Sequence, residues 1–396
     1  MTMPSLTHRS IQKSLAFVSC FWVMSCGVLF ADVGISTLNG DFKALTLSGS
    51  RIVAIDLSTP SEILTSDDDG GSFTTRMTAG PLDRYEALAA VGSTVVAVGI
   101  DGLVLRSGDS GTSWSAASAP SLLGALYSVA GRSDGENPNQ WLSVGDDGFD
   151  GSVYRSTDDG LNWTAHSITG VLLEDVIWTG NRWLLCGRDD FNEGALYSSV
   201  DGLTWSASTV PVASSPLLAM THDGSGGVVA VGESGQVLRS TDDGLTFSVV
   251  AADLFSGDIN AVAYASDGTF YLGGDEKAVI RLNGSNASFL IPPAAQATPV
   301  LEIILIGNVP FAAGAFAGVQ VRTIPLDLLL TTGGTLDYRL SVSQALSGKT
   351  YFLETSTDLT SDWTPLPSSS QLGNGGPIFF DVSEEGSRRF WRVAEF

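Results

Sequence analysis

Two acidic loops hold the residues whose types and spacing are best suited to binding chemistry. One loop reads GDDGFDG and the other GRDDFNEG, so that each combines several carboxylates with one phenylalanine. An aromatic ring among carboxylates can contact a cationic or a sugar-bearing partner, and carboxylate oxygens are also ligands that calcium accepts. The alternative interpretation is a solvated acidic turn whose phenylalanine folds back onto the protein. The candidate binding residues are Asp146, Asp147, Phe149 and Asp150 in the first loop, and Asp189, Asp190, Phe191 and Glu193 in the second.

Residues for nucleophilic or metal-dependent catalysis are scarce. After residue 31 the chain contains only two histidines, His166 and His222, which excludes a histidine-rich metal site and leaves few candidates for a Ser-His-Asp triad. Both histidines are interpreted as surface residues. Cys186 lies in an apolar segment and is interpreted as inert packing. No catalytic residue, metal site or cofactor is therefore predicted, with calcium at the acidic loops as the alternative.

The acidic loops belong to a repeat of about 42 residues. Each copy has short apolar segments rich in Val, Ile, Leu and aromatics, separated by turn residues, which is typical of strands. Four strands in each of seven copies predict an all-β fold, a seven-bladed β-propeller over residues 32–332. Either the segment PLDLLLTT or the stretch 34–39 completes the seventh copy. The positions expected to be equivalent are Thr65, Arg106, Arg155, Tyr197, Arg239, Arg281 and Arg322.

A second motif, S-x-D-x-G-x-x-[WF], recurs between the third and fourth strands of the copies. Asp and Ser side chains bond the amides of their own turn, Gly supplies a positive φ, and the aromatic packs between strands. These residues are therefore predicted to be structural, and the repeated arginines likewise. A weaker copy has Ser198, Gly202 and Trp205, with Val200 at the Asp position. The motif residues are Asp68, Asp109, Asp158 and Asp242, with the aromatics Trp114, Trp163, Trp205 and Phe247.

This motif resembles the Asp-box, or bacterial neuraminidase repeat. The stretch VGESGQVLRSTDDGLTF, residues 231–247, is most similar to the photosystem II assembly-factor-like family. The resemblance implies a propeller that binds a partner during assembly. Sialidases and xyloglucan-cleaving hydrolases share the motif, which implies a glycan-active enzyme of sialidase or glycoside hydrolase type as the alternative. The Arg-Ile-Pro pattern of sialidases is absent near the N-terminus, and RTIP at Arg322 is interpreted as coincidence.

The two ends of the chain differ from the repeat. Residues 1–31 are interpreted as a signal peptide, or as a lipoprotein leader in which VMSC makes Cys26 the acylated residue. Residues 335–396 predict a small β-sandwich-like module. A net charge of −23 disfavours nucleic acid and anionic lipid as partners. The combined prediction is a secreted, periplasmic or cell-surface scaffold, non-catalytic, with a protein or glycan partner in the envelope and a membrane link only through Cys26.

Overall fold

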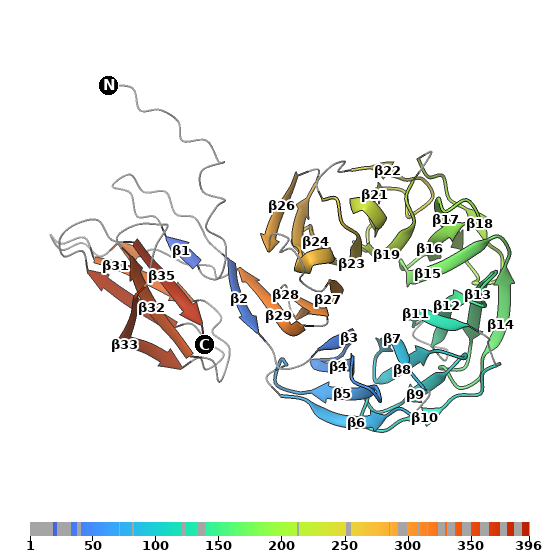
Figure 1. Ribbon diagram of the computed structural model, residues 1–396, viewed down its shortest axis with the longest axis horizontal. Coiled ribbons are helices and arrows are strands. Elements are labelled where there is room, and N and C mark those ends of the chain that lie inside the picture. Colours follow the sequence, from blue (N-terminus) through green and yellow to red (C-terminus); the bar gives the residue numbers. More distant parts are fainter. Residues whose placement is uncertain are drawn as a thin grey trace. The chain divides into compact units, whose positions relative to one another are not determined.

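In the residues that it describes, the computed structural model is built of β-strands and two short 3-10 turns (Figure 1). It describes residues 19–21, 33–37 and 41–306, with gaps at 71, 81–82, 121–123, 134–138, 212–213, 251–254, 285 and 292–298, and beyond 306 only the strands named below. Within these residues, no helix has the length and apolar character needed to cross a membrane. The prediction of an all-β propeller is confirmed, since four-stranded antiparallel sheets follow one another around a ring.

The first three blades each use four strands that are consecutive in the chain. Within each blade the first strand lies nearest the centre of the ring, and the fourth lies at its outer edge (Figure 1). Their strands are β3 (Phe42–Ser48), β4 (Arg51–Asp56), β5 (Glu62–Ser66) and β6 (Thr74–Thr78); β7 (Tyr85–Val91), β8 (Thr94–Gly99), β9 (Val104–Ser107) and β10 (Ser115–Ala116); and β11 (Ala125–Arg132), β12 (Gln140–Asp146), β13 (Gly151–Ser156) and β14 (Thr164–Ile168).

The next three blades repeat this order. Two of them carry a 3-10 turn between the second and third strands, η2 (Glu233–Gly235) and η3 (Asp275–Lys277). Their strands are β15 (Val171–Trp178), β16 (Trp183–Asp189), β17 (Gly194–Ser199) and β18 (Ser206–Ala207); β19 (Leu217–His222), β20 (Val228–Gly232), β21 (Val237–Ser240) and β22 (Ser248–Val249); and β23 (Ile259–Tyr264), β24 (Thr269–Gly274), β25 (Val279–Asn283) and β26 (Asn286–Ile291).

The structure has six such blades, whereas the repeat predicts seven, so the predicted count is wrong. The expected seventh copy supplies only β27 (Val300–Ile306), β28 (Val309–Gly314) and β29 (Phe316–Thr323) to a sheet of order β2-β29-β28-β27. Its remaining strand, β2 (Val33–Thr37), precedes the first blade in the chain. The sequence differs here, because the residues after Thr323 lack the Ser-Asp-Gly turn that precedes the fourth strand in the first five blades. β27 lies against both β23 and β3, between the sixth and first blades.

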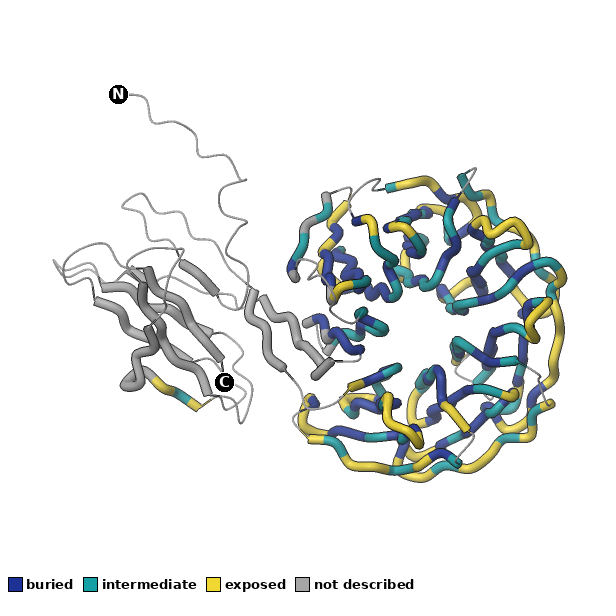
Figure 2. The backbone as a smooth tube through the Cα atoms, in the orientation of Figure 1, coloured by how far each residue is buried: buried dark blue, intermediate teal, exposed yellow. Residues whose placement is uncertain are grey.

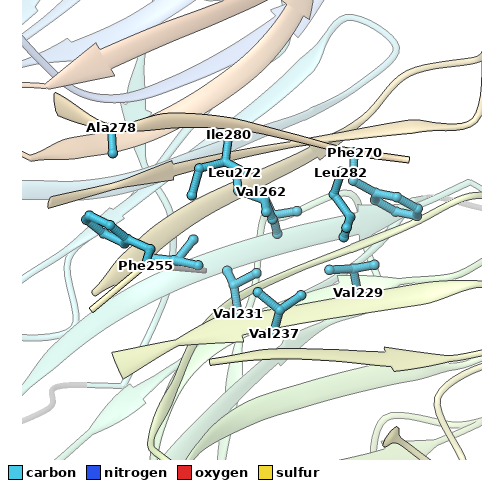
Figure 3. Packing of buried hydrophobic residues seen from close by; sticks show 11 residues of the cluster. Val229, Val231, Val237, Phe255, Val262, Phe270, Leu272, Ala278, Ile280 and Leu282 are labelled. Carbon is cyan, nitrogen blue, oxygen red and sulfur yellow. The ribbon is translucent and has the colours of Figure 1, made fainter. Parts of the chain in front are cut away.

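Packing between neighbouring blades forms the core. The second strands are apolar along their whole length and buried on both faces, as in β8, TVVAVG, where each residue is buried (Figure 2). Between the fifth and sixth blades, Val229, Val231 and Val237 face Val262, Leu272 and their neighbours (Figure 3). Burial of this kind contributes about 25 cal/mol per Å² of apolar surface, which makes it the main stabilising term. It also explains why the strands read as continuous apolar runs without polar alternation.

The turns between third and fourth strands are built as the motif predicts. In the fifth blade, Ser240 Oγ donates to Asp242 Oδ1 at 2.7 Å and accepts from Gly244 N at 2.9 Å. Asp242 also accepts from Thr246 N at 2.9 Å and from Thr246 Oγ1 at 2.6 Å. These bonds hold the pKa of Asp242 down at about 2, the Thr246 hydroxyl having the largest effect. The turns of Asp68, Asp109 and Asp158 repeat the same bonds.

The fourth blade departs from the expected register. Ser199 Oγ, rather than that of Ser198, donates to an acid, and the acid is Asp201 at 2.9 Å. Asp201 Oδ1 then accepts from Leu203 N and Thr204 N at 2.8 Å each, while Val200 is exposed. Ser198, and not Tyr197 as predicted, is therefore the residue equivalent to Arg106 and Arg239. The reason is that this turn is one residue shorter than the others. The sequence contains this shorter turn as the pattern S-x-D-G at residues 199–202.

The same turns also tie neighbouring blades together. Arg106 of the second blade donates from Nε to the carbonyl oxygen of Asp159, at 2.6 Å, and pairs with the carboxylate of Asp159, in the turn of the third blade. Arg182 of the fourth blade donates to Asp243 Oδ2, in the turn of the fifth, at 3.0 Å. Asp159 and Asp243 adopt φ of 64° and 63°, which turns each toward the preceding blade.

Two compact units make up the chain: residues 38–319, and residues 1–37 together with 320–396. The second unit has a sheet of order β1-β35-β32-β33 and a sheet of order β30-β31-β34. The predicted boundaries at 31, 332 and 335 remain predictions, and Cys26 lies outside the described residues. The strands of this unit not yet named are β1 (Ser19–Phe21), β30 (Leu329–Leu330), β31 (Asp337–Val342), β32 (Thr350–Ser356), β33 (Thr364–Leu372), β34 (Ile378–Ser383) and β35 (Phe390–Glu395).

Removing a turn acid should destabilise the propeller. We expect Asp242→Ala and Asp201→Ala each to lower the free energy of unfolding by about 1–2 kcal/mol, because turn amides and hydroxyls lose a charged acceptor that water replaces only in part. Urea unfolding followed by tryptophan fluorescence measures this. The controls Thr241→Ala and Val200→Ala change exposed side chains of the same turns, and we expect little effect from them. Equal stability of Asp201→Ala and Val200→Ala would contradict the register found in the fourth blade.

Candidate functional site

A central cavity of about 590 Å³ is hollowed into the described part of the chain. It is lined by the first strand of each of the six blades, β3, β7, β11, β15, β19 and β23, and by β27. A cavity of this size falls within the range of small-ligand and side-chain pockets. It is therefore the first candidate site, although the sequence analysis placed function only in the loops.

All seven strands that line this cavity carry a β-bulge at the same place. In β15, for example, Leu173 pairs with Gly187 and Asp175 with Cys186, so Glu174 is the extra residue. A bulge re-aims its side chain and is often found next to a functional site. All seven extra residues line the cavity, and we call them the mouth ring: Lys43, Glu86, Tyr127, Glu174, Leu218, Asn260 and Leu301.

Charges gather on one half of the mouth ring. Glu86 is 5% exposed and pairs with Lys43 Nζ at 3.2 Å and with Arg84 Nε at 2.5 Å, so its charge is balanced within the protein. Glu174 has only a distant partner, Arg188 Nη1 at 3.8 Å. Burial raises the pKa of Glu174, and Arg188 partly opposes this. The mouth therefore keeps an incompletely balanced carboxylate.

Tyr127 connects the mouth ring to the first acidic loop. Burial raises the pKa of its hydroxyl to about 12, and the nearby carboxylate of Asp146 adds to this effect through its charge and a hydrogen bond. Asp146 ends β12 and also raises the pKa of Glu174. The root of the first loop thus shares one electrostatic environment with the cavity mouth.

A second ring follows the first, one residue further along each strand. We call it the inner ring; five of its members are small and two are acids, and all line the cavity: Ala44, Ala87, Ser128, Asp175, Ala219, Ala261 and Glu302. Asp175 accepts from Ser128 Oγ at 2.6 Å, Met220 N at 2.7 Å and Val176 N at 2.8 Å. It thereby joins the third, fourth and fifth blades, and burial raises its pKa to about 6.

Both acidic loops present their phenylalanine to solvent. Phe149 and Phe191 are each 85% exposed, so neither ring folds back onto its blade. Asp147 Oδ1 accepts from Phe149 N at 3.0 Å and from Asp150 N at 2.8 Å, and Asp189 Oδ1 accepts from Phe191 N at 2.9 Å. Asp147 and Asp189 therefore fix the backbone of their loops. The amides of Asp150 and Phe149 hold the pKa of Asp147 below its usual range.

The remaining predicted loop acids are distributed around this braced backbone. Asp189 Oδ1 also accepts from Glu193 N at 2.9 Å, and Asp150 Oδ1 accepts from Gly170 N at 3.0 Å. Asp190 lies in the second loop before Phe191. Since strand two ends and strand one begins at the same edge of a blade, the loops lie at the cavity end that holds the mouth ring. The role of these residues in binding remains a prediction.

Other chemistry has little support in the described residues. Among them, no group of three or more His, Cys, Asp or Glu side chains could hold a metal ion. His166 lies exposed on β14, as expected, whereas His222, predicted to lie at the surface, lines the cavity at the end of β19. Burial lowers the pKa of His222, and its Nδ1 accepts from Gly224 N at 3.2 Å. Cys186 is buried in β16.

Comparisons with known proteins identify the fold alone. No family model and no curated protein match the sequence. A structure of YCF48 bound to D1 peptide is 16% identical, with a TM-score of 0.56, and the match covers 76% of this chain and 99% of that one. A streptogramin B lyase is 12% identical, with a TM-score of 0.60 and coverage of 74% and 98%. The WD40 propeller of Doa1 is 12% identical, with a TM-score of 0.56 and coverage of 74% and 97%.

The partly buried acids of the inner ring should make stability depend on pH. Burial raises the pKa of Glu302 to about 8 and that of Asp175 to about 6. An acid with a raised pKa in the folded state stabilises the fold below its unfolded pKa of about 4, and this contribution is lost as pH rises through the folded value. We therefore expect the free energy of unfolding to fall between about pH 4 and 8.

Glu302→Gln should remove the upper part of this dependence, between about pH 6 and 8, because an amide does not ionise there. Urea unfolding at three pH values across this range measures the slope. The matched control is Glu62→Gln on β5, outside the cavity, which should keep the wild-type slope. The same slope in Glu302→Gln and in wild type would show that Glu302 ionises as in water.

Proposed function

We propose that this chain is a non-catalytic binding scaffold that recognises a protein partner through the face carrying the two acidic loops. The observation that carries the proposal is the pair of phenylalanines, Phe149 and Phe191, each 85% exposed in equivalent loops of adjacent blades. The same exposed aromatic recurs in two loops of neighbouring blades, and aromatic residues are enriched where proteins meet. The backbone bonds of Asp147 and Asp189 fix both loops, so little ordering entropy is lost on binding.

Charge around the phenylalanines indicates the kind of partner. Acids flank each phenylalanine in the sequence of its loop, and the whole chain carries a net charge of −23. An apolar centre with a charged border suits a protein surface better than a buried metabolite. The negative border favours a partner whose contact surface is basic, and attraction between opposite charges would speed the encounter.

Family resemblance supports a protein partner. The Ser-Asp-Gly turns have the hydrogen bonds expected of Asp-box repeats, and we propose that the chain belongs with Asp-box propellers close to the photosystem II assembly-factor-like family. One similar fold, YCF48, is described as bound to D1 peptide. By analogy of fold, a peptide segment is a reasonable partner here.

A glycan-active enzyme is the weaker alternative. Such an enzyme needs two free carboxyl groups facing one substrate, or arginines converging on a carboxylate. In the cavity, Asp175 is engaged by three donors and Glu86 by two basic side chains. These bonds give both acids structural roles. Of the two other carboxyl groups in the described lining, Glu174 has Arg188 Nη1 at 3.8 Å, so only Glu302 has no basic partner, and a pair of free carboxyl groups for hydrolysis does not remain.

We also propose a secreted or envelope location, with residues 1–31 as a signal peptide or with Cys26 as a lipid anchor. The basic and then apolar order of these residues supports this. Cell fractionation of the tagged full chain, with and without Cys26→Ser, tests it. A cytosolic wild-type protein would contradict the location, and release of the protein from membranes by Cys26→Ser would favour the anchor.

The double change Phe149→Ser and Phe191→Ser should weaken partner capture about tenfold or more, since central aromatics dominate interface energies. Partners are captured from an extract of the source cell, identified by mass spectrometry, and then measured individually against both proteins. The matched control, Leu161→Ser with Leu245→Ser, removes two exposed leucines from the turns at the opposite ends of the third strands. Unchanged affinity of the phenylalanine variant, with the fold confirmed by circular dichroism, would show that the two loops are solvated turns and not a binding surface.

Calcium at the loops is tested separately. Titration calorimetry with calcium chloride should detect no binding by wild type, because Asp147 and Asp189 already accept backbone amides. Calcium binding that disappears in Asp146→Asn with Asp189→Asn would favour an ion site instead.

A further inference from the structure

Glu302 occupies the same place on β27 that Asp175 occupies on β15, but it lacks the partners of Asp175. Each acid accepts the amide of the next residue, Glu302 from Ile303 N at 3.2 Å and Asp175 from Val176 N at 2.8 Å. Asp175 then receives the hydroxyl of Ser128, the inner-ring residue of the preceding blade. The equivalent residue before Glu302 is Ala261, which has no side-chain donor. Glu302 therefore keeps free acceptor capacity inside the cavity.

The other charged and titratable groups that line the cavity do not supply a partner for Glu302. They are Lys43 from β3, Glu86 from β7, Tyr127 from β11, Glu174 and Asp175 from β15, and His222 from β19; the lining residues of β23 are all neutral. Lys43, the lone Lys or Arg among the described lining residues, is bonded to Glu86. The lining thus holds four carboxyl groups against one such cation, and that cation is already engaged.

We propose that the central cavity binds a basic side chain, Lys or Arg, that projects from a segment of the partner, with Glu302 as its main counter-ion. This rests on the proposed function, because the cavity mouth and the loops of Phe149 and Phe191 lie at the same end of the blades. It names the feature of the partner that the cavity selects.

Size and electrostatics agree with such an occupant. The cavity, about 590 Å³, accommodates a long side chain together with water. Lys43 at the mouth is 36% exposed, so the entrance is open to solvent. A guanidinium group presents several donors and meets a carboxylate bidentately, which suits a lone acceptor such as Glu302. Ala261 and Ala44 flank Glu302 without blocking it.

Proton balance gives the binding step a second readout. Burial and the charge of Asp175 raise the pKa of Glu302 to about 8, so at neutral pH its carboxyl holds a proton. When a cationic side chain arrives, the ionised form is favoured and the proton passes to solvent. The cation stays charged, one proton is released for each peptide bound, and charge is conserved. Binding should therefore tighten as pH rises toward about 8.

The test uses the whole propeller and three probes: an acetylated and amidated Gly-Gly-Arg-Gly-Gly peptide, the same peptide with citrulline in place of arginine, and N-acetyl-argininamide. Calorimetry at about pH 7, in two buffers of different ionisation enthalpy, gives the affinity and the number of protons released. We expect the arginine peptide to bind with proton release and the citrulline peptide to bind about 30-fold or more weakly. Equal binding of these two peptides would overturn the proposal. Equal binding of N-acetyl-argininamide and the arginine peptide would overturn the assignment to a partner segment.

Two variants and a control locate the site. Glu302→Gln should weaken the arginine peptide about 30-fold or more and abolish proton release. Ala261→Ser keeps every charge and gives Glu302 the hydroxyl that Ser128 gives Asp175, so it should also weaken the peptide. Glu62→Gln on β5 should bind as wild type does. Wild-type binding by a folded Glu302→Gln protein would overturn the proposal.

The proposal for the loop surface and the proposal for the cavity can be tested independently. Phe149→Ser with Phe191→Ser should leave binding of the short arginine peptide unchanged, because that peptide has no apolar side chain. If the phenylalanine variant loses its partner and Glu302→Gln does not, the proposed function stands and the cavity inference falls. If wild type binds the arginine peptide but the phenylalanine change has no effect on partner capture, the loop surface falls and the cavity inference stands.

Discussion

Burial of both faces of each blade is the constraint on which the rest of this structure depends. A four-stranded sheet of about 42 residues has too little apolar surface to fold alone, and it becomes stable only between two neighbours. This explains why the second strands, such as β8 and β20, are apolar throughout and fully buried. It also explains why the ring needs β27 and β28 between the sixth and first blades, where the regular repeat ends.

The polar groups that remain inside this packed ring serve mainly as ties between blades. The acid of each Ser-Asp-Gly turn closes its own turn. In the third and fifth blades the residue after it, Asp159 or Asp243, has a positive φ and bonds Arg106 or Arg182 of the preceding blade. Asp175 performs the same task at the centre of the ring by joining three blades. A partly buried acid such as Asp175 is tolerated because hydrogen-bond donors replace the water that it loses.

Variation is confined to positions that packing does not specify. The extra residue of each inner bulge points into the cavity, and it differs from blade to blade, from Lys43 and Glu86 to Leu218 and Leu301. The loops between second and third strands lie outside the packed layers, and two of them are enlarged around an exposed phenylalanine. Specific recognition can therefore develop at the mouth and rim of the ring without cost to the core, as is usual for loops on rigid scaffolds.

The sequence by itself determined the strands, the repeat and the turn chemistry. These depend on local patterns, namely apolar runs, glycines at positive φ, and a Ser and an Asp within reach of the same amides. It also pointed to Phe149 and Phe191, because two neighbouring loops depart from the repeat in the same way. In the fourth blade the distance from the motif serine to its glycine is one residue shorter. The motif pattern therefore placed Val200 at the position of the acid, which is in fact Asp201.

Only the tertiary structure decided how the ring ends and what its centre contains. β2 and β29 are separated by most of the chain, and no local pattern connects them. The mouth ring and the inner ring gather one residue from each of seven distant strands, through bulges that leave no mark in the apolar run. Whether an acid such as Asp175 or Glu302 is satisfied depends on the residue of the neighbouring blade, Ser128 or Ala261, and long-range packing alone brings these side chains together.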